Sequence, residues 1–373
     1  MWRAAGAAVV PLGRVFARFA VNARRMLHAS LVRSVLSLLL GVVALATATA
    51  QDIHYSNLSA VPMQVNPAYT GLMEHRMRVG FDHRSQWGNF TNGYKTTSLS
   101  ADVKAYQQGG DVLGLGVHVI SDQAGDLDFA TQQVSLNAAY TKALDRNRTF
   151  LSFGLQNVFS AQQLDWSQAQ GFDYEPLADE GAGSRGMLWD VGAGAALFLR
   201  PTRSTAYFVG LAGAHLNNPS VTFLGYDSED AGTRLYTKWT FHAGGELQVG
   251  PSHSFRPSVL YLYQGPNRQL KLGSFWRYRA DNGLHTDAEV AVHFGAWLRT
   301  YFGQGGSGVD AVNMAARFDY DKTSVVVSFD VNISSLVVAS SGFGGPEVAL
   351  VQQLDWGTPR RRRHRVKCPT FQY

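Results

Sequence analysis

Hydrophobic and polar residues alternate along much of the chain beyond the first fifty residues. In one such stretch, Val327 and Phe329 occupy one set of alternate positions, and Ser328 and Asp330 occupy the other. Successive side chains of a strand point to opposite faces, so this pattern predicts a strand with an apolar face and a wet face. The same alternation recurs in residues 76–82, 98–104 and 289–299.

Turn-forming residues divide the alternating region into about fourteen predicted strands. Each strand and its turn take about 20 residues, enough for a tilted membrane-crossing strand of about 9 to 11 residues. An even strand number is typical of single-chain bacterial outer-membrane barrels. The predicted strands begin near residues 76, 97, 112, 130, 149, 188, 205, 234, 254, 269, 286, 311, 323 and 346.

Alternation alone leaves two all-β folds open, because the strands of a soluble β-sandwich alternate in the same way. Three features favour a transmembrane antiparallel β-barrel over residues 76–358. They are an export signal, 38 glycines, and a mean hydropathy of −0.11, which suits strands between lipid and a polar lumen. Beyond the first fifty residues, no apolar run approaches the ~20 residues of a membrane-spanning helix.

The export signal lies in residues 1–50, which have the three parts of a secretory signal peptide. A basic start is followed by an apolar stretch over 35–46 and by small residues at 48–50. The apolar stretch is too short for a membrane anchor of ~20 residues. We therefore expect cleavage after residue 50. The part before Met26 is either an overlong extension or the result of a misassigned start, since Met26 alone would begin an ordinary signal peptide. Residues 51–75 are then expected to form a periplasmic segment.

Positive charge is concentrated at the two ends of the chain. The net charge is +5, yet all 28 acidic residues lie between residues 51 and 359, where they outnumber 21 basic residues. An acidic body argues against a nucleic-acid-binding surface. The basic tail, residues 359–373, is expected to contact anionic lipid or an acidic protein, or simply to remain a charged tail in the periplasm.

Residues with recognisable chemistry are sparse. The single cysteine, Cys368, excludes an intramolecular disulfide. The 11 histidines lack zinc-ligand spacing, no Gly-x-Ser-x-Gly motif occurs, and no glycine-rich loop leads into a predicted helix. The sequence therefore predicts no cofactor, no metal site and no catalytic residue. A hydrolase whose residues meet only in the folded barrel stays an open alternative.

Short motifs occur in a fixed order near the start of the mature chain and again near its end. Pro67 restricts the backbone on both sides of its nitrogen and Gly71 permits a left-handed turn, so the second motif is expected to be a preformed turn. The motifs are Gln51-Asp-Ile-His-Tyr-Ser56, Asn66-Pro67-Ala68-Tyr69-Thr-Gly71, His83-Arg84-Ser-Gln86-Trp87 and Cys368-Pro369-Thr-Phe371.

This ordered set resembles the PorP/SprF family of the type IX secretion system, and the resemblance extends over residues 51–371. Residues 189–195, 208–219 and 257–260 are similar to further family segments, whereas Gln372 and Tyr373 extend the chain beyond the family's terminus. The candidate partner-contact residues that the resemblance implies are Asn66, Pro67, Ala68, Tyr69, Gly71, Arg84, Gln86, Trp87, Cys368, Pro369 and Phe371. For Arg84 and Gln86 beside Trp87, we also expect a strand end at the membrane interface.

The resemblance also implies a function without catalysis. Such a protein is an outer-membrane component that supports secretion or surface display of protein cargo, for example an adhesin in gliding motility. The implied partners are periplasmic ring lipoproteins, the cargo itself and outer-membrane lipid, with no nucleic acid. A passive porin or a channel for small hydrophobic molecules is the alternative that the sequence leaves open.

Overall fold

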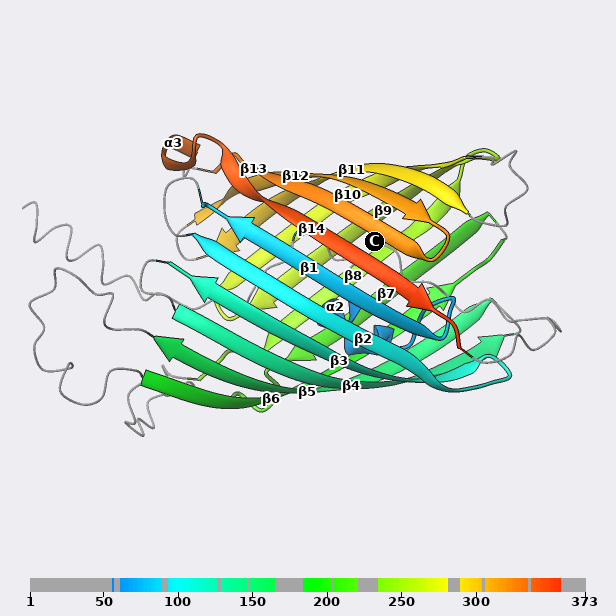
Figure 1. The fold of residues 1–373 in the computed structure, drawn as a ribbon, viewed down its shortest axis with the longest axis horizontal. Coiled ribbons are helices and arrows are strands. Elements are labelled where there is room, and N and C mark those ends of the chain that lie inside the picture. Colours follow the sequence, from blue (N-terminus) through cyan, green and yellow to red (C-terminus); the bar gives the residue numbers. More distant parts are fainter. Residues whose placement is uncertain are drawn as a thin grey trace, which may run out of the picture. The chain divides into compact units, whose positions relative to one another are not determined.

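Figure 1 shows a computed structural model of the protein. It describes residues 56, 61–88, 93–125, 129–145, 148–164, 184–202, 204–220, 234–280, 289–303, 306–334 and 337–356. The chain divides into two units, residues 1–52 and 53–373, and every described residue belongs to the second. The predicted signal peptide and the basic tail from residue 359 lie outside the described residues.

The described residues form fourteen antiparallel strands that close into a barrel, as the alternation predicts. In Figure 1 the strands run obliquely across the barrel. They are β1 (Met77–Gln86), β2 (Tyr94–Gln108), β3 (Asp111–Ala124), β4 (Phe129–Asp145), β5 (Thr149–Leu164), β6 (Ser184–Leu199), β7 (Thr205–Ala214), β8 (Lys238–Gln248), β9 (His253–Gln264), β10 (Asn267–Ala280), β11 (Val290–Gly303), β12 (Gly306–Tyr320), β13 (Thr323–Asn332) and β14 (Phe343–Leu354). Each strand pairs with its neighbours in sequence, and β1 pairs with β14.

The predicted strand positions agree closely with the observed ones. β5, β7 and β13 begin at the predicted residues 149, 205 and 323. β12 begins at Gly306 rather than near residue 311, because glycine and serine dominate its first residues and give no apolar alternation. Among the described residues, no helix combines the length and apolar character needed to cross a membrane.

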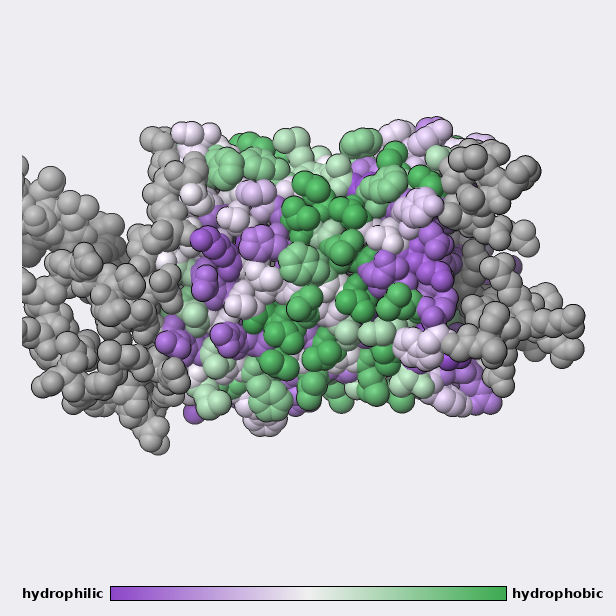
Figure 2. All heavy atoms as spheres, in the orientation of Figure 1, coloured by the Kyte–Doolittle hydropathy of each residue, from purple (hydrophilic) through white to green (hydrophobic). Residues whose placement is uncertain are grey.

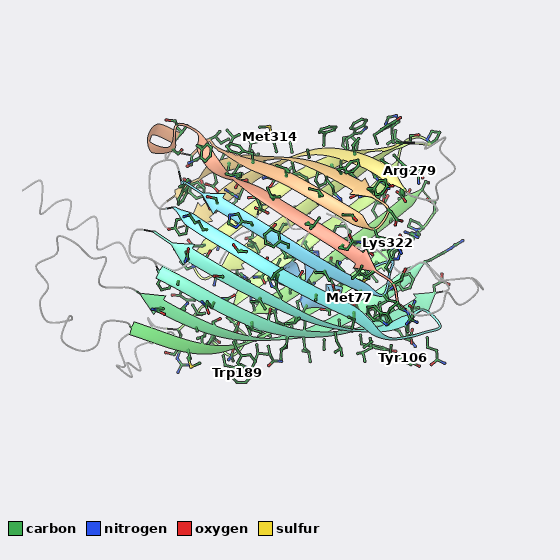
Figure 3. The ribbon with its side chains drawn as sticks, in the orientation of Figure 1. Met77, Tyr106, Trp189, Arg279, Met314 and Lys322 are labelled. Atoms are coloured by element: carbon green, nitrogen blue, oxygen red, sulfur yellow. The ribbon has the colours of Figure 1, made fainter. Side chains whose placement is uncertain are left out.

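Apolar side chains face outward from the barrel and polar side chains face the lumen. On β13, Val327 is 50% exposed on the outer face, whereas Ser328 and Asp330 are 2% and 1% exposed, which confirms the predicted orientation of this strand. Figure 2 shows hydrophobic residues forming a band between two more polar zones. In Figure 3, Met314 and Trp189 project from the outer face. This is the surface of a barrel embedded in a bilayer.

The lengths of the connections between strands show which end of the barrel faces the periplasm. One end holds the start of β1, the end of β14 and short turns such as 109–110 and 321–322. The opposite end holds the long connections 165–183 and 215–237. Outer-membrane barrels have short periplasmic turns and longer extracellular loops. We therefore assign the end where β1 begins to the periplasm.

Candidate functional site in the barrel lumen

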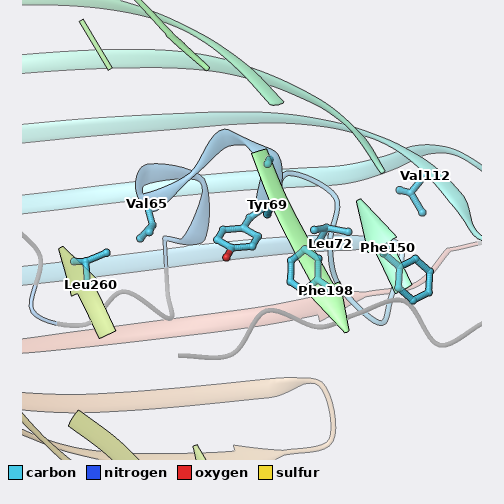
Figure 4. Packing of buried hydrophobic residues seen from close by; sticks show 9 residues of the cluster. Val65, Tyr69, Leu72, Val112, Phe150, Phe198 and Leu260 are labelled. Carbon is cyan, nitrogen blue, oxygen red and sulfur yellow. The ribbon is translucent and has the colours of Figure 1, made fainter. Parts of the chain in front are cut away.

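The barrel lumen contains part of the chain that precedes β1. Residues 61–73, here called the luminal segment, include the short helices α2 (Pro62–Val65) and η1 (Pro67–Tyr69). Tyr69 and Leu72 have no exposed surface. Burial of a large apolar side chain stabilises a fold by about 1.5–3 kcal/mol, so these contacts hold the segment firmly. Figure 4 shows the wall residues around it, Val112, Phe150, Phe198 and Leu260.

Asn66 joins the luminal segment to three adjacent strands. Its side-chain nitrogen donates to the carbonyl oxygens of Ala195 on β6 (3.1 Å) and Leu211 on β7 (3.3 Å). The same nitrogen lies 3.0 Å from Nε2 of His242 on β8, whose Nδ1 lies 2.9 Å from the Tyr69 hydroxyl. The Asn66 side-chain oxygen accepts from the backbone N–H of Ala68 in η1. Both ends of the carboxamide are therefore bound, as a buried polar group requires.

A row of small residues on the inner wall makes room for the turn of the luminal segment at residues 66–68. A Cβ atom at Gly154 would lie 2.3 Å from the Ala68 nitrogen, and one at Gly194 would lie 2.0 Å from Asn66 Oδ1. Both distances are shorter than any real side-chain contact, so the wall accepts the segment because these positions are glycine. The small-residue row consists of successive cross-strand partners on β3 to β7: Gly114, Ala139, Gly154, Gly194 and Ala212.

Gly71 lies in close contact with β3. Its φ of +76° lies in the left-handed region that favours glycine, and a Cβ there would lie 2.6 Å from the Gly114 Cα. Its N–H donates to Asp102 Oδ2 at 2.8 Å. Arg78 pairs with the same carboxylate at 2.7 Å and also donates to the carbonyl oxygen of Tyr69. The turn expected from Pro67 and Gly71 is thus fixed by a buried ion pair.

Upstream of the luminal segment, Ser56 is held by charged residues on the opposite wall. Its N–H donates to Glu347 on β14 at 2.8 Å, and its hydroxyl donates to Asp330 on β13 at 2.7 Å. Lys271 on β10 donates to its carbonyl oxygen. All three polar groups of this residue are therefore bound. The Ser56 cluster comprises Ser56, Arg84, Lys271, Arg299, Asp330 and Glu347.

Opposite charges offset one another within the Ser56 cluster. Arg84 and Arg299 each lie 2.9 Å from Asp330 Oδ2, and Asn313 donates to the other oxygen at 2.8 Å. Arg84 also lies 3.7 Å from Glu347. Buried charges are costly unless they are paired and hydrogen-bonded. The cluster therefore fixes Ser56 through a network in which loss of one partner would leave another charge unpaired.

The chain leaves the lumen at the periplasmic end, beside the last residue of β14. The Arg76 N–H donates to the carbonyl oxygen of Leu354 at 3.1 Å. His75 Nδ1 lies 2.6 Å from a carboxylate oxygen of Asp355. Partial burial raises the pKa of Asp355, but the hydrogen bond and charge of His75 outweigh it and lower that pKa. These contacts fix the luminal segment where β1 and β14 meet.

The structure distributes the predicted site residues over three places. Asn66, Pro67, Ala68, Tyr69 and Gly71 lie in the lumen, in contact with the wall. Cys368, Pro369 and Phe371 lie outside the described residues. The residues of the third motif, Arg84 to Trp87, lie in two places: Arg84 faces the lumen, and Gln86 and Trp87 lie where β1 ends.

Arg84 lies near the end of β1, two residues before Gln86. It faces the lumen in the Ser56 cluster, because it shares the inward alternate positions of β1 with Arg78. Gln86 is the last residue of β1, and Trp87 follows with a φ of 58°. The Trp87 ring packs edge-on against Tyr94, with ring centroids 5.4 Å apart.

Sequence reasoning missed the wall residues that hold the luminal segment. Asp102, His242 and Lys271 all occupy inward positions, yet single polar residues at alternate positions look alike before the strands are paired. Within the described residues, no group of three or more potential metal ligands is arranged to hold an ion. The contacts between the chain and the wall are hydrogen bonds, buried ion pairs and close steric fit.

A family model described as type IX secretion system membrane protein PorP/SprF matches residues 47–343. The chain belongs to the PorP/SprF family. The match includes Ser56, the luminal segment and all strands through β13. PorP/SprF membership, together with the barrel fold, places the protein in the bacterial outer membrane as a component of secretion or transport. Its partners accordingly belong to the type IX machinery.

Solved structures similar to this PorP/SprF barrel match it with low TM-scores and low sequence identity. The toluene transporter TbuX of Ralstonia pickettii has a TM-score of 0.45 and 11% identity, over 80% of this chain and 94% of its own. The CymD monoaromatic hydrocarbon channel gives 0.44 and 11%, with the same coverage. CdiB from Acinetobacter baumannii gives 0.41 and 9%, over 75% and 60%. No curated protein matches the chain in sequence.

Proposed function

We propose that this protein is a non-enzymatic outer-membrane component of the type IX system that supports secretion or surface display of a protein cargo. The observation that carries the proposal is the family match over residues 47–343. The luminal segment supports it, because part of the protein's own chain occupies the lumen and packs against its wall. An adhesin is one cargo of the proposed kind.

The proposed partners are periplasmic ring lipoproteins, the cargo and the surrounding lipid. Residues 66–71 are engaged by the barrel wall, which makes the basic tail the principal candidate for contact with a periplasmic partner. Its positive charges would attract acidic surfaces and speed association, and salt would weaken that attraction. Removal of residues 359–373 is expected to reduce the recovery of ring proteins in pull-downs at low salt.

Deletion of the gene tests the proposed function. The deletion strain should keep synthesising its cargo but retain it in the periplasm, and the wild-type gene supplied in trans should restore surface display. Fractionation and surface labelling of intact cells measure both outcomes. A deletion strain that displays all its surface proteins but loses uptake of a small solute would replace this proposal with the channel function.

A further inference from the structure

Strand β6 continues beyond its neighbour β7 at the extracellular end of the barrel. β6 begins at Ser184, directly after the long connection 165–183, but its ladder with β7 contains only residues 193–199. On its other side, β6 pairs with β5 along all of residues 184–199. One edge of β6, at residues 184–192, therefore has no neighbouring strand within the described part of the chain.

Asn217 covers the first part of this edge with its side chain. Its amide oxygen accepts from the Val191 N–H at 3.1 Å, and its amide nitrogen donates to the Trp189 carbonyl oxygen at 2.8 Å. The Leu216 N–H donates to the Val191 carbonyl oxygen at 3.0 Å. The carboxamide thus takes the place of a main-chain amide of a further strand. These bonds also show that the backbone groups of Val191 and Trp189 point away from β5.

The part of the edge beyond Asn217, residues 184–189, is here called the β6 edge. Every second residue of a strand directs its N–H and C=O to the same side, so Met187 directs both groups to the same side as Trp189. Among the described residues, nothing bonds to these two groups of Met187 or to the Trp189 N–H. Unpaired groups in this spacing are a template for another strand. The β6 edge has no proline and no bulge against β5, so neither feature hinders such pairing.

The side chains of the β6 edge also leave apolar surface uncovered. Met187 is 88% exposed and Trp189 is 54% exposed, and Figure 3 shows Trp189 on the outer face. Met187 has the largest exposed fraction of the large hydrophobic side chains that the structure describes. A strand beside β6 would cover one flank of both side chains, as cross-strand neighbours do. Hydrogen-bonding groups and apolar surface therefore occur together on the β6 edge.

We propose that the β6 edge is a docking site for an extended segment of an extracellular polypeptide, which would join the barrel wall as a further strand. The occupant would have apolar residues at alternate positions, where they would cover Met187 and Trp189. The edge faces along the wall, so a single extended segment fits it better than a second barrel. The proposal does not rest on the secretion function, since it follows from the unequal lengths of β6 and β7.

Binding of a synthetic peptide to the purified full-length protein tests the proposal. The probe is a short fluorescent peptide of alternating valine and threonine with terminal lysines, and the control peptide has proline at alternate positions. Met187→Pro removes an N–H that points away from β5, so it should block docking and keep the β5–β6 ladder. We expect the probe to bind Met187→Pro about tenfold more weakly than the wild type. Met187→Ala keeps the N–H and should bind the probe more tightly than Met187→Pro.

Amide hydrogen exchange of the wild-type protein decides the outcome even if Met187→Pro does not fold. Without the probe, the Met187 and Trp189 amides should exchange rapidly, whereas the Leu188 amide, which points towards β5, should be protected. The probe should then protect Met187 and Trp189. Protection of both amides without the probe would overturn the proposal, because another part of this chain or a second copy would fill the edge. So would a probe that leaves both amides unprotected, or that binds the wild type and Met187→Pro equally.

Discussion

Gly154 and Gly194 show how single residues of the wall select what the lumen contains. Each lies where a backbone or side-chain atom of the luminal segment would meet a Cβ atom at less than van der Waals distance. Asn66 then fixes the orientation of the luminal segment, because its carboxamide bonds to β6, β7 and β8. Steric room and hydrogen bonding are thus supplied by different residues, and a change in either should weaken the same contact.

Gly154→Ala tests the steric part of this contact. The added methyl group would meet the Pro67 carbonyl carbon and the Ala68 nitrogen at 2.3 Å, so the luminal segment must shift. Overpacking of this kind typically costs about 1–3 kcal/mol, and we expect the free energy of unfolding in urea to fall by an amount in that range. Gly250→Ala is the control, since no atom lies within 4 Å of its Cβ position. Equal stability of the two variants would contradict the close fit.

The strands are the elements that the sequence predicts most directly. Lipid outside and polar groups inside impose opposite preferences on successive residues, so alternation predicts both the barrel and the orientation of β13. The sequence does not predict the contact between the wall and the luminal segment. Gly114 and Gly194 become part of one row only through the register of β3 to β6, and no local pattern encodes that register. The sequence does not predict that Arg84 joins the Ser56 cluster, because its partners Asp330 and Glu347 lie far along the chain.

Val327→Arg tests the lipid-facing side of β13. An arginine near the middle of the bilayer on the lipid face costs about 2–4 kcal/mol, and the cost falls to about 0–1 kcal/mol near an interface. We therefore expect a clear loss of stability for Val327→Arg in lipid vesicles, measured by reversible unfolding. Lys322→Arg in the turn before β13 is the matched control and should have little effect. A similar small effect at both positions would show that Val327 does not face lipid.

At the scale of the whole molecule, the barrel is a closed wall around its own amino-terminal region. The luminal segment fills the periplasmic half on the side of β3 to β9, and the Ser56 cluster occupies the side of β10 to β14 and β1. The motif that resembles the PorP/SprF family therefore has a structural role inside the barrel. A passive porin, in contrast, has a water-filled lumen.

Electrical recording across a planar lipid bilayer measures directly whether the lumen is closed to ions. The purified full-length protein, with its folded state verified before insertion, is compared with a general porin inserted under the same conditions. We expect no sustained ion conductance from the wild-type barrel, because Ser56 and the luminal segment are held against different parts of the lumen wall. A steady, porin-like conductance from the wild-type protein would contradict it.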